Sequence, residues 1–117
     1  MQRVENKAFT EQFDIIVSFL NISVPPSIRN SPRQIAGVVN TRVRLQCESD
    51  GLPKPIITWE KNGEPFPTTG LRHMMLEKGS LEFVSVQIED SGDYTCLATN
   101  PAGNATRDVQ LRVQGNV

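Results

Sequence analysis

The sequence predicts an all-β fold, a sandwich of two antiparallel sheets with Greek-key connections. Three observations lead to this prediction. Short stretches after residue 24 alternate between apolar and polar side chains, and no segment keeps the 3.6-residue apolar period of a helix. Turn-forming residues separate these stretches about every 8–12 positions. Finally, the two cysteines and the one tryptophan, Cys47, Cys96 and Trp59, all fall on the apolar side of the alternation.

The first strand with clear alternation covers residues 41–47, where Val43, Leu45 and Cys47 share one face. Residues 51–55 combine a glycine with two prolines and are predicted to form a turn. A strand at residues 56–59 follows.

In that second strand Ile57 and Trp59 point inward. The next segment, residues 61–64, contains the pair Asn62-Gly63, which predicts a tight hairpin because these residues supply two positive φ angles. Three further strands are predicted at residues 80–86, 93–99 and 106–113, with Leu81, Phe83, Tyr94, Cys96, Ala98, Val109, Leu111 and Val113 inward.

The spacing of these inward residues suggests how the two sheets are joined. Trp59 lies 12 residues after Cys47, and Cys96 lies 49 residues after it. A bond between the cysteines would link the facing sheets with the indole beside it, although the cysteine count by itself leaves two buried free thiols open. Tyr94 lies two residues before Cys96, where its hydroxyl can tie down the preceding corner of the chain.

With these motifs the chain resembles the I-set of the immunoglobulin superfamily. The matching segments are Leu45-Gln-Cys47, Gly51-x-Pro53-x-Pro55, Trp59-Glu-Lys-Asn-Gly63, Gly79-Ser-Leu81, Asp90-x-Gly92-x-Tyr94-x-Cys96 and Asn100-x-x-Gly103. The resemblance implies one inter-sheet disulfide, Cys47–Cys96, and a core that includes Trp59, Leu45, Leu81 and Tyr94. It also implies an ion pair between Arg72 and Asp90; the alternative is that Arg72 is a solvated surface charge.

The resemblance covers residues 25–114, which we take as the domain, with residues 115–117 as a C-terminal tail. Residues 1–24 fall outside it and are expected to be a flexible segment. Within them, residues 19–24 have the pattern of the last strand of a preceding immunoglobulin domain, and residues 24–28 are interpreted as the linker to this one. Acidic residues and the lack of a small-residue cleavage site argue against a signal peptide at the start.

Composition argues against several classes of function. The net charge is −1 and no basic tract occurs, so a nucleic-acid partner is not expected. The apolar run at residues 15–20 is too short to span a membrane. His73, the only histidine, is interpreted as a surface residue of an edge strand. No catalytic residues, metal site or cofactor are predicted, and we do not expect an enzyme.

Binding is therefore the expected activity. The outward side of one sheet offers Thr58, Thr95, Leu97 and Arg112 as a candidate interface, although a single exposed leucine is also normal on a protein surface. On the opposite sheet Arg42 and Arg44 point outward; we expect them to pair with Glu82, with sulfated glycans as the alternative ligand.

Two sequons add a candidate modification. Asn21 and Asn104 each begin an Asn-x-Ser/Thr triplet, the acceptor for N-glycosylation in secreted proteins, and Asn104 is expected in the turn at residues 100–104. The alternative is that both are ordinary polar residues.

The chain is most similar to domains of hemicentin-type extracellular matrix and adhesion proteins. This resemblance implies a secreted matrix protein or a membrane-protein ectodomain, with protein partners: neighbouring immunoglobulin domains, a second copy, or a matrix or cell-surface ligand. Two alternatives remain open, a ligand-binding domain of a receptor tyrosine kinase ectodomain and an intracellular muscle-type I-set spacer.

Overall fold

The computed structural model describes residues 12–13, 15–16, 19–20 and 22–115 of the 117-residue chain. From Val24 onward the chain forms strands and one 3₁₀ helix. In order these are β1 (Val24–Ile28), β2 (Gln34–Val38), β3 (Val43–Leu45), β4 (Ser49–Leu52), β5 (Ile56–Lys61), β6 (Glu64–Phe66), β7 (His73–Met75), β8 (Leu81–Phe83), η1 (Ile88–Asp90), β9 (Gly92–Asn100) and β10 (Gly103–Gln114).

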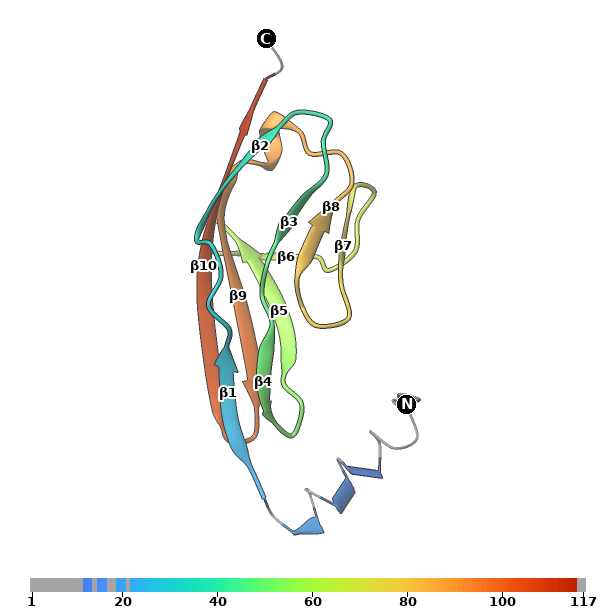
Figure 1. The fold of residues 1–117 in the computed structure, drawn as a ribbon, viewed down its shortest axis with the longest axis vertical. Helices are drawn as coiled ribbons and strands as arrows, with labels where there is room; N and C mark the ends of the chain where they lie inside the picture. Colours follow the sequence, from blue (N-terminus) through green and yellow to red (C-terminus); the bar gives the residue numbers. More distant parts are fainter. Residues whose placement is uncertain (1–11, 14, 17–18, 21, 116–117) are drawn as a thin grey trace, which may run out of the picture.

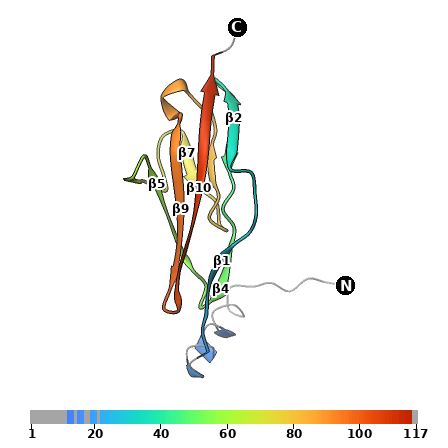
Figure 2. The same cartoon turned by 90° about the vertical axis from the view of Figure 1, so that its left-hand side faces the viewer.

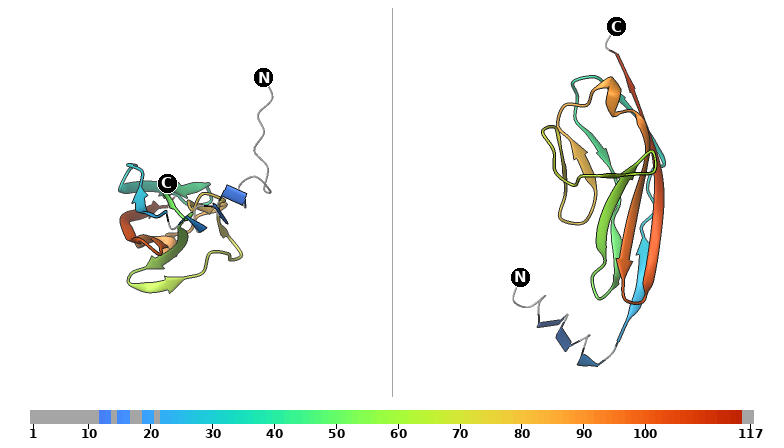
Figure 3. Two further views of the ribbon diagram at one scale, coloured as in Figure 1. Left: turned by 90° about the horizontal axis from the view of Figure 1, so that it is seen from below. Right: turned by 180° about the vertical axis from the view of Figure 1, so that it is seen from behind.

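The strands form two facing layers (Figure 1, Figure 2). One layer is a five-stranded sheet in the order β2-β10-β9-β5-β6, and the other contains the β1–β4 pair and the three-stranded sheet β3-β8-β7. The two small sheets continue one another because β3 and β4 are successive parts of one stretch of chain. The chain changes layer between β1 and β2, β2 and β3, β4 and β5, β6 and β7, and β8 and β9, as Greek-key connections do (Figure 3).

The core lies between the layers, on the side that the alternation assigns. The inward residues predicted for the strands are all buried, which confirms the predicted sandwich. The core cluster consists of Val43, Leu45, Cys47, Ile57, Trp59, Leu81, Phe83, Val86, Tyr94, Cys96, Ala98, Val109, Leu111 and Val113.

The hairpin between β5 and β6 has the backbone predicted from its sequence. Asn62 and Gly63 have φ angles of 52° and 82°, and Lys61 pairs with Glu64. Two positive φ angles give the tight two-residue turn that suits the twist of the flanking strands. Because of this turn the short β6 lies at the edge of the five-stranded sheet.

Residues 24–28, interpreted as a linker, instead form β1, so that interpretation is corrected. β1 pairs antiparallel with β4, and β4 includes Gly51 and Leu52 from the segment predicted as a turn. The register of the pair shifts between Val24 and Ser27. Two prolines occupy the shifted positions, and proline has no N–H to donate to a sheet ladder.

β2 was not predicted as a strand, and its pairing departs from the antiparallel expectation. It runs parallel to the end of β10, with Gln34 opposite Gln110 and Val38 opposite Gln114. The short segment at residues 29–33 therefore crosses from the β1–β4 layer to the edge of the five-stranded sheet. β2 and β10 are far apart in sequence, so no local pattern indicates this pairing.

Upstream of the sandwich, the described residues differ from the strand predicted at residues 19–24. Phe13, Ile16 and Phe19 are helical, and the amide of Leu20 donates to the carbonyl of Ile16 at 2.9 Å. A strand needs a neighbouring strand to complete its hydrogen bonds, whereas a helix satisfies its backbone within the segment. None of the helical stretches among the described residues is long and apolar enough to cross a bilayer.

Candidate functional site

A disulfide joins the two layers at the centre of the domain. Cys47 and Cys96 are bonded with their Cα atoms 6.5 Å apart, and both are fully buried. Cys96 belongs to β9 in the five-stranded sheet, and Cys47 lies between β3 and β4 in the other layer. Trp59 is the cross-strand partner of Cys96, so its indole lies next to the bond as predicted.

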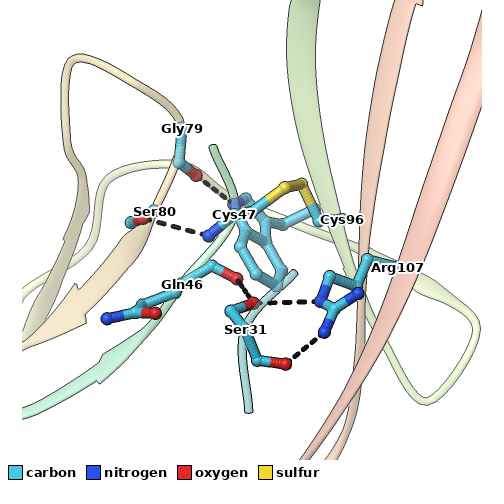
Figure 4. Close-up of a disulfide and its surroundings, with 8 residues drawn as sticks. Ser31, Gln46, Cys47, Gly79, Ser80, Cys96 and Arg107 are labelled. Atoms are coloured by element: carbon cyan, nitrogen blue, oxygen red, sulfur yellow. Dashed lines mark hydrogen bonds between the residues drawn. A yellow bond between two sulfur atoms is a disulfide. The ribbon is translucent and has the colours of Figure 1, made fainter. Parts of the chain in front are cut away.

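Two hydrogen bonds between side chains and the backbone connect the surroundings of the disulfide to Gly79 and Ser80 (Figure 4). The indole N–H of Trp59 donates to the carbonyl of Gly79 at 2.8 Å, and the amide of Cys47 donates to the hydroxyl of Ser80 at 3.0 Å. Gly79 has a φ of +115°, and a Cβ added there would lie 2.9 Å from the carbonyl oxygen of Cys47. Only glycine fits this position without strain.

The corner before β9 has the hydroxyl contact predicted for Tyr94. Tyr94 donates to the carbonyl of Asp90 at 2.5 Å, within hydrogen-bonding distance. Burial, together with the negative charge of Asp90, raises the pKa of the Tyr94 hydroxyl above its usual range. The hydroxyl is therefore a permanent donor at physiological pH, and it fixes the turn that leads from η1 into β9.

The structure brings Arg72 and Asp90 together at the same corner. The guanidinium donates to both carboxylate oxygens, at 2.5 and 2.9 Å, and the amide of Gln87 donates to the same carboxylate at 2.7 Å. Burial raises the pKa of Asp90. The hydrogen bonds from Arg72 and Gln87, with the positive charge of Arg72 and of Lys61, outweigh it and hold that pKa below its ordinary value.

A second arginine, Arg107, is buried, and it was not among the residues predicted for the site. It is 5% exposed and lies opposite Cys96 in the β9–β10 ladder. Its guanidinium donates to the hydroxyl of Ser31 at 3.0 Å and to the carbonyl of Ser31 (Figure 4). It also donates to the side-chain oxygen of Asn30 at 3.2 Å. The strand alternation was the available signal, because 107 has the same parity as the inward Val109.

The contacts of Arg107 fall on the segment that crosses between the layers. The Ser31 hydroxyl also lies 3.5 Å from the carbonyl of Gln46, next to Cys47. One side chain on β10 thus connects the crossing segment at residues 29–33 to the five-stranded sheet.

The outward side of the five-stranded sheet contains the residues predicted as an interface. Thr58, Leu97 and Thr106 form one row across β5, β9 and β10. Thr95 lies in the next row and donates to the carboxylate of Asp108 at 2.8 Å. Thr58 is exposed, whereas Leu97 and Thr95 are half-buried.

Arg112, the fourth predicted interface residue, does not join that group. It lies opposite Ala36 of β2. Along β10 it lies four residues beyond Asp108, which pairs with Thr95, or about 13 Å at the rise of a strand. The four predicted residues therefore do not form one compact cluster.

A shallow groove lies on the same sheet, next to Thr95. It is lined by Arg33, Asn62, Asp93, Thr95, Asp108 and Gln110, among others. Its lining combines one positive and two negative side chains, so the groove is polar and could contact the polar surface of another protein.

On the opposite layer, Arg42 and Arg44 share Glu82 as a partner. The two N–O distances are 3.4 and 3.3 Å. The side chain of Glu82 is mostly buried, while the two arginines are more than half exposed. This arrangement matches the expected pairing.

Of the two sequon asparagines, the structure describes Asn104. Asn104 is exposed, and it is the second residue of β10, where it pairs with Thr99; the turn itself is confined to Pro101 and Ala102. The predicted turn position is therefore corrected by two residues. Asn21 lies outside the described residues.

His73 is more enclosed than a surface histidine. Its ring stacks on Phe66 with centroids 4.5 Å apart, and Nε2 lies 2.8 Å from the carbonyl oxygen of Pro67. Its role in this structure is packing at the β7 edge. Across the part of the chain that the structure describes, no three His, Cys, Asp or Glu side chains are grouped as a metal site needs.

A two-layer sandwich with a buried inter-layer disulfide, a tryptophan beside it and a tyrosine corner defines an immunoglobulin-like domain. The sequence pattern of the Immunoglobulin I-set domain matches residues 26–113, and the chain belongs to that family.

The chain is also similar in sequence or structure to known immunoglobulin-domain proteins. The chain is 45% identical over 95 residues to Hemicentin-1 of Homo sapiens, which covers 80% of this chain and 2% of that protein. Roundabout homolog 1 of Homo sapiens is 35% identical over 108 residues, covering 92% of this chain and 6% of that protein. The chain thus spans a small part of both relatives. A chain of the titin M10–obscurin-like 1 Ig complex superimposes with a TM-score of 0.74 at 28% identity, over 80% of this chain and 98% of that one.

Proposed function

We propose that this domain is a non-catalytic protein–protein interaction module of the extracellular space, one unit in the tandem immunoglobulin array of an adhesion or matrix protein. The observation that carries the proposal is the buried disulfide between Cys47 and Cys96. Disulfides form and persist in oxidising compartments and are rare in the cytosol. The 45% identity to Hemicentin-1 supports the adhesion or matrix side of the proposal.

The placement of the domain ends supports a tandem array. β1 begins at one end of the sandwich and β10 finishes at the other (Figure 1). Neighbouring domains can then follow one another head to tail without crossing the sheet faces. The match to Roundabout homolog 1 leaves only nine of the 117 residues outside it, so it extends upstream of β1. This likeness upstream of the domain is what a segment joined to a preceding repeat would produce.

Protein is the proposed partner because the outward faces are of mixed polarity. The five-stranded sheet presents threonines, a half-buried leucine and a groove with both signs of charge. Interfaces of moderate size resemble such surfaces in composition. A second copy, a neighbouring domain and a cell-surface or matrix ligand all meet this description.

Thiol labelling of the protein from its native source tests the compartment. Because both cysteines are buried, the protein is denatured in the presence of an alkylating reagent, and only then reduced and labelled again with a second reagent of different mass. We expect Cys47 and Cys96 to carry only the second label. Both cysteines with the first label would contradict the extracellular proposal and favour an intracellular spacer.

The intracellular spacer is the second candidate, and the likeness to the titin M10–obscurin-like 1 Ig complex favours it. As a spacer the same sandwich would rely on its apolar core without the covalent link. The labelling pattern separates the two candidates because they differ in the redox state of the same two residues.

A further inference from the structure

The register of the five-stranded sheet places the sequon asparagine on the candidate interface. Asn104 of β10 lies opposite Thr99 of β9, and Thr99 lies opposite Ile56 of β5. Neighbouring strands are about 4.8 Å apart, so Asn104 and Ile56 are about 10 Å apart on one row. The adjacent row contains Thr58 and Leu97.

Ile56 is an unusual residue for such a position. It is 72% exposed and begins β5, where only β9 lies beside it, because β6 pairs with β5 only at Trp59–Lys61. Asn104, Thr99 and Ile56 are all exposed on the same row. The apolar surface at this end of the sheet therefore lies within reach of a group attached to Asn104.

We propose that Asn104 carries an N-linked glycan whose core covers Ile56 and Leu97, so that sugar occupies this end of the sheet. Protein docking on this sheet is then confined to the other end, at the groove near Asp93 and Asp108. The inference rests on the proposed extracellular function, since N-glycosylation takes place in the secretory pathway.

The attachment needs a donor of a defined class, an oligosaccharide carried on a lipid pyrophosphate. The side-chain nitrogen of Asn104 forms a bond to the anomeric carbon of the first sugar. The bond from that carbon to the pyrophosphate oxygen breaks, and the pyrophosphate leaves with the electron pair. The amide nitrogen loses one proton. The chain supplies Thr106 as the third sequon residue, and its side chain lies on the same outward side as Asn104.

The first part of the test is occupancy of the sequon. The full chain with Asn21→Gln is secreted from mammalian cells, and its intact mass is measured before and after peptide-N-glycosidase treatment. We expect a loss of mass for this protein and for a Thr106→Ser variant, which keeps the sequon. A Thr106→Val variant, which loses the sequon but keeps a β-branched side chain in the strand, should show no change.

The second part is coverage of the sheet, measured by hydroxyl-radical footprinting. Oxidation of Ile56 and Leu97 should rise severalfold when the glycan is removed by the glycosidase or by Thr106→Val. Met74 of β7 on the other layer, and Leu71 in the connection that precedes β7, are exposed and serve as internal controls. Their oxidation should not change.

Three outcomes would overturn the proposal that a glycan on Asn104 covers Ile56 and Leu97. Asn104 could remain unmodified in a secreted, disulfide-bonded protein, which leaves the proposed function intact. Oxidation of Ile56 could be the same with and without sugar. Protection of Ile56 could persist after sugar removal while the protein sediments as a dimer, which would assign this end of the sheet to a second copy. Failure of the proposed function appears separately, as free thiols in the native protein.

Discussion

Among single side chains, Arg72 and Asp90 form the charged contact that organises the corner before β9. The carboxylate of Asp90 is about nine-tenths buried, while Arg72 is about one-third exposed. The carbonyl of the same Asp90 accepts the hydroxyl of Tyr94. Loss of the arginine would leave a mostly buried carboxylate with only the amide of Gln87 as a donor.

We expect Arg72→Ala to lower the free energy of unfolding by about 1–2 kcal/mol, below the top of the range for charged hydrogen bonds because Arg72 is partly solvated. Urea denaturation measures the change. Arg42→Ala is the matched control. Its side chain is 65% exposed and Arg44 shares the same carboxylate, so a loss under about 1 kcal/mol is expected. Equal losses in the two variants would contradict a special role for the corner pair.

The same carboxylate predicts an acid dependence of stability. The pKa of Asp90 is lower in the folded protein than its ordinary value of 3.8. Between the folded and unfolded pKa values the unfolded chain binds more protons, so stability rises with pH there. The contribution of Asp90 is present above pH 3.8 and is lost as the pH falls through the folded pKa.

Urea titrations at a series of pH values between 2 and 6 (about the range over which carboxylates titrate) measure this dependence. We expect Asp90→Asn to be less stable than the parent at neutral pH and to lose less stability on acidification. An unchanged pH dependence in the variant would show that other carboxylates are responsible.

Among the elements, two turns use glycine in different ways. Gly63 in the β5–β6 hairpin has a φ of +82° and open space where a Cβ would lie. Gly79 before β8 also has a positive φ, and there an added Cβ would meet the Cys47 carbonyl oxygen and Ile57, both at 2.9 Å. Only the second site adds steric overlap to backbone strain.

We therefore expect Gly63→Ala to cost about 1–2 kcal/mol from the positive φ by itself. Gly79→Ala should cost clearly more, because the added Cβ would lie 2.9 Å from the Cys47 carbonyl oxygen and from Ile57. Relief of this overlap would also displace the Gly79 carbonyl that accepts from Trp59. Thermal unfolding followed by tryptophan fluorescence compares the two variants. A smaller loss at Gly79 than at Gly63 would contradict the tight approach of backbone to the disulfide.

The segment that crosses between the layers depends on Arg107. Its guanidinium connects β10 to Asn30 and Ser31. We expect Arg107→Met, which keeps a long apolar stem, to reduce stability by about 1–3 kcal/mol because the acceptors lose their donor. Amide hydrogen exchange at residues 29–34 should become faster. Arg112→Met, on the exposed side of the same strand, should leave this exchange unchanged; if both variants behave alike, Arg107 does not hold the crossing.

For the molecule as a whole, the disulfide is the covalent link between the layers. It closes a loop with a sequence separation of 49 residues. In the chain-entropy treatment such a loop stabilises the folded state by about 4 kcal/mol. Cys47→Ala together with Cys96→Ala should lower the free energy of unfolding by about this amount, with further loss from the two small cavities.

Equilibrium unfolding of the double variant and of the parent measures the difference. Parent protein incubated with reductant should approach the stability of the double variant. If reduction and substitution leave stability unchanged, the apolar core holds the sandwich without covalent help, as the intracellular spacer would require.

Local sequence was sufficient for the strands with clear alternation and for the centre of the domain. Val43, Leu45 and Leu81 are buried as their parity indicates, because successive residues of a strand point to opposite faces. The hairpin at Asn62-Gly63 follows from the φ angles that these two residue types adopt. The positions of the cysteines, the tryptophan and Tyr94 predicted the link between the sheets and the corner before β9.

Other features depended on residues far away in the chain. The segment 24–28 contains two prolines and has no alternation, and it becomes β1 only because β4 lies beside it. Arg107 can be buried because Asn30 and Ser31, in the segment that crosses between the layers, accept hydrogen bonds from its guanidinium. A charged side chain can occupy an inward position only when such acceptors are present.

The amino-acid order by itself determined which faces are apolar, where the chain turns, and which side chains surround the cysteine pair, since period and turn preference act over a few neighbouring residues. Only the tertiary structure decided which strands lie side by side. It placed β2 parallel to β10 and put Asn104 on the same row as Ile56. The physical reason is that a strand completes its hydrogen bonds with a neighbouring strand that is often distant in sequence, and closure of the whole sandwich selects that neighbour.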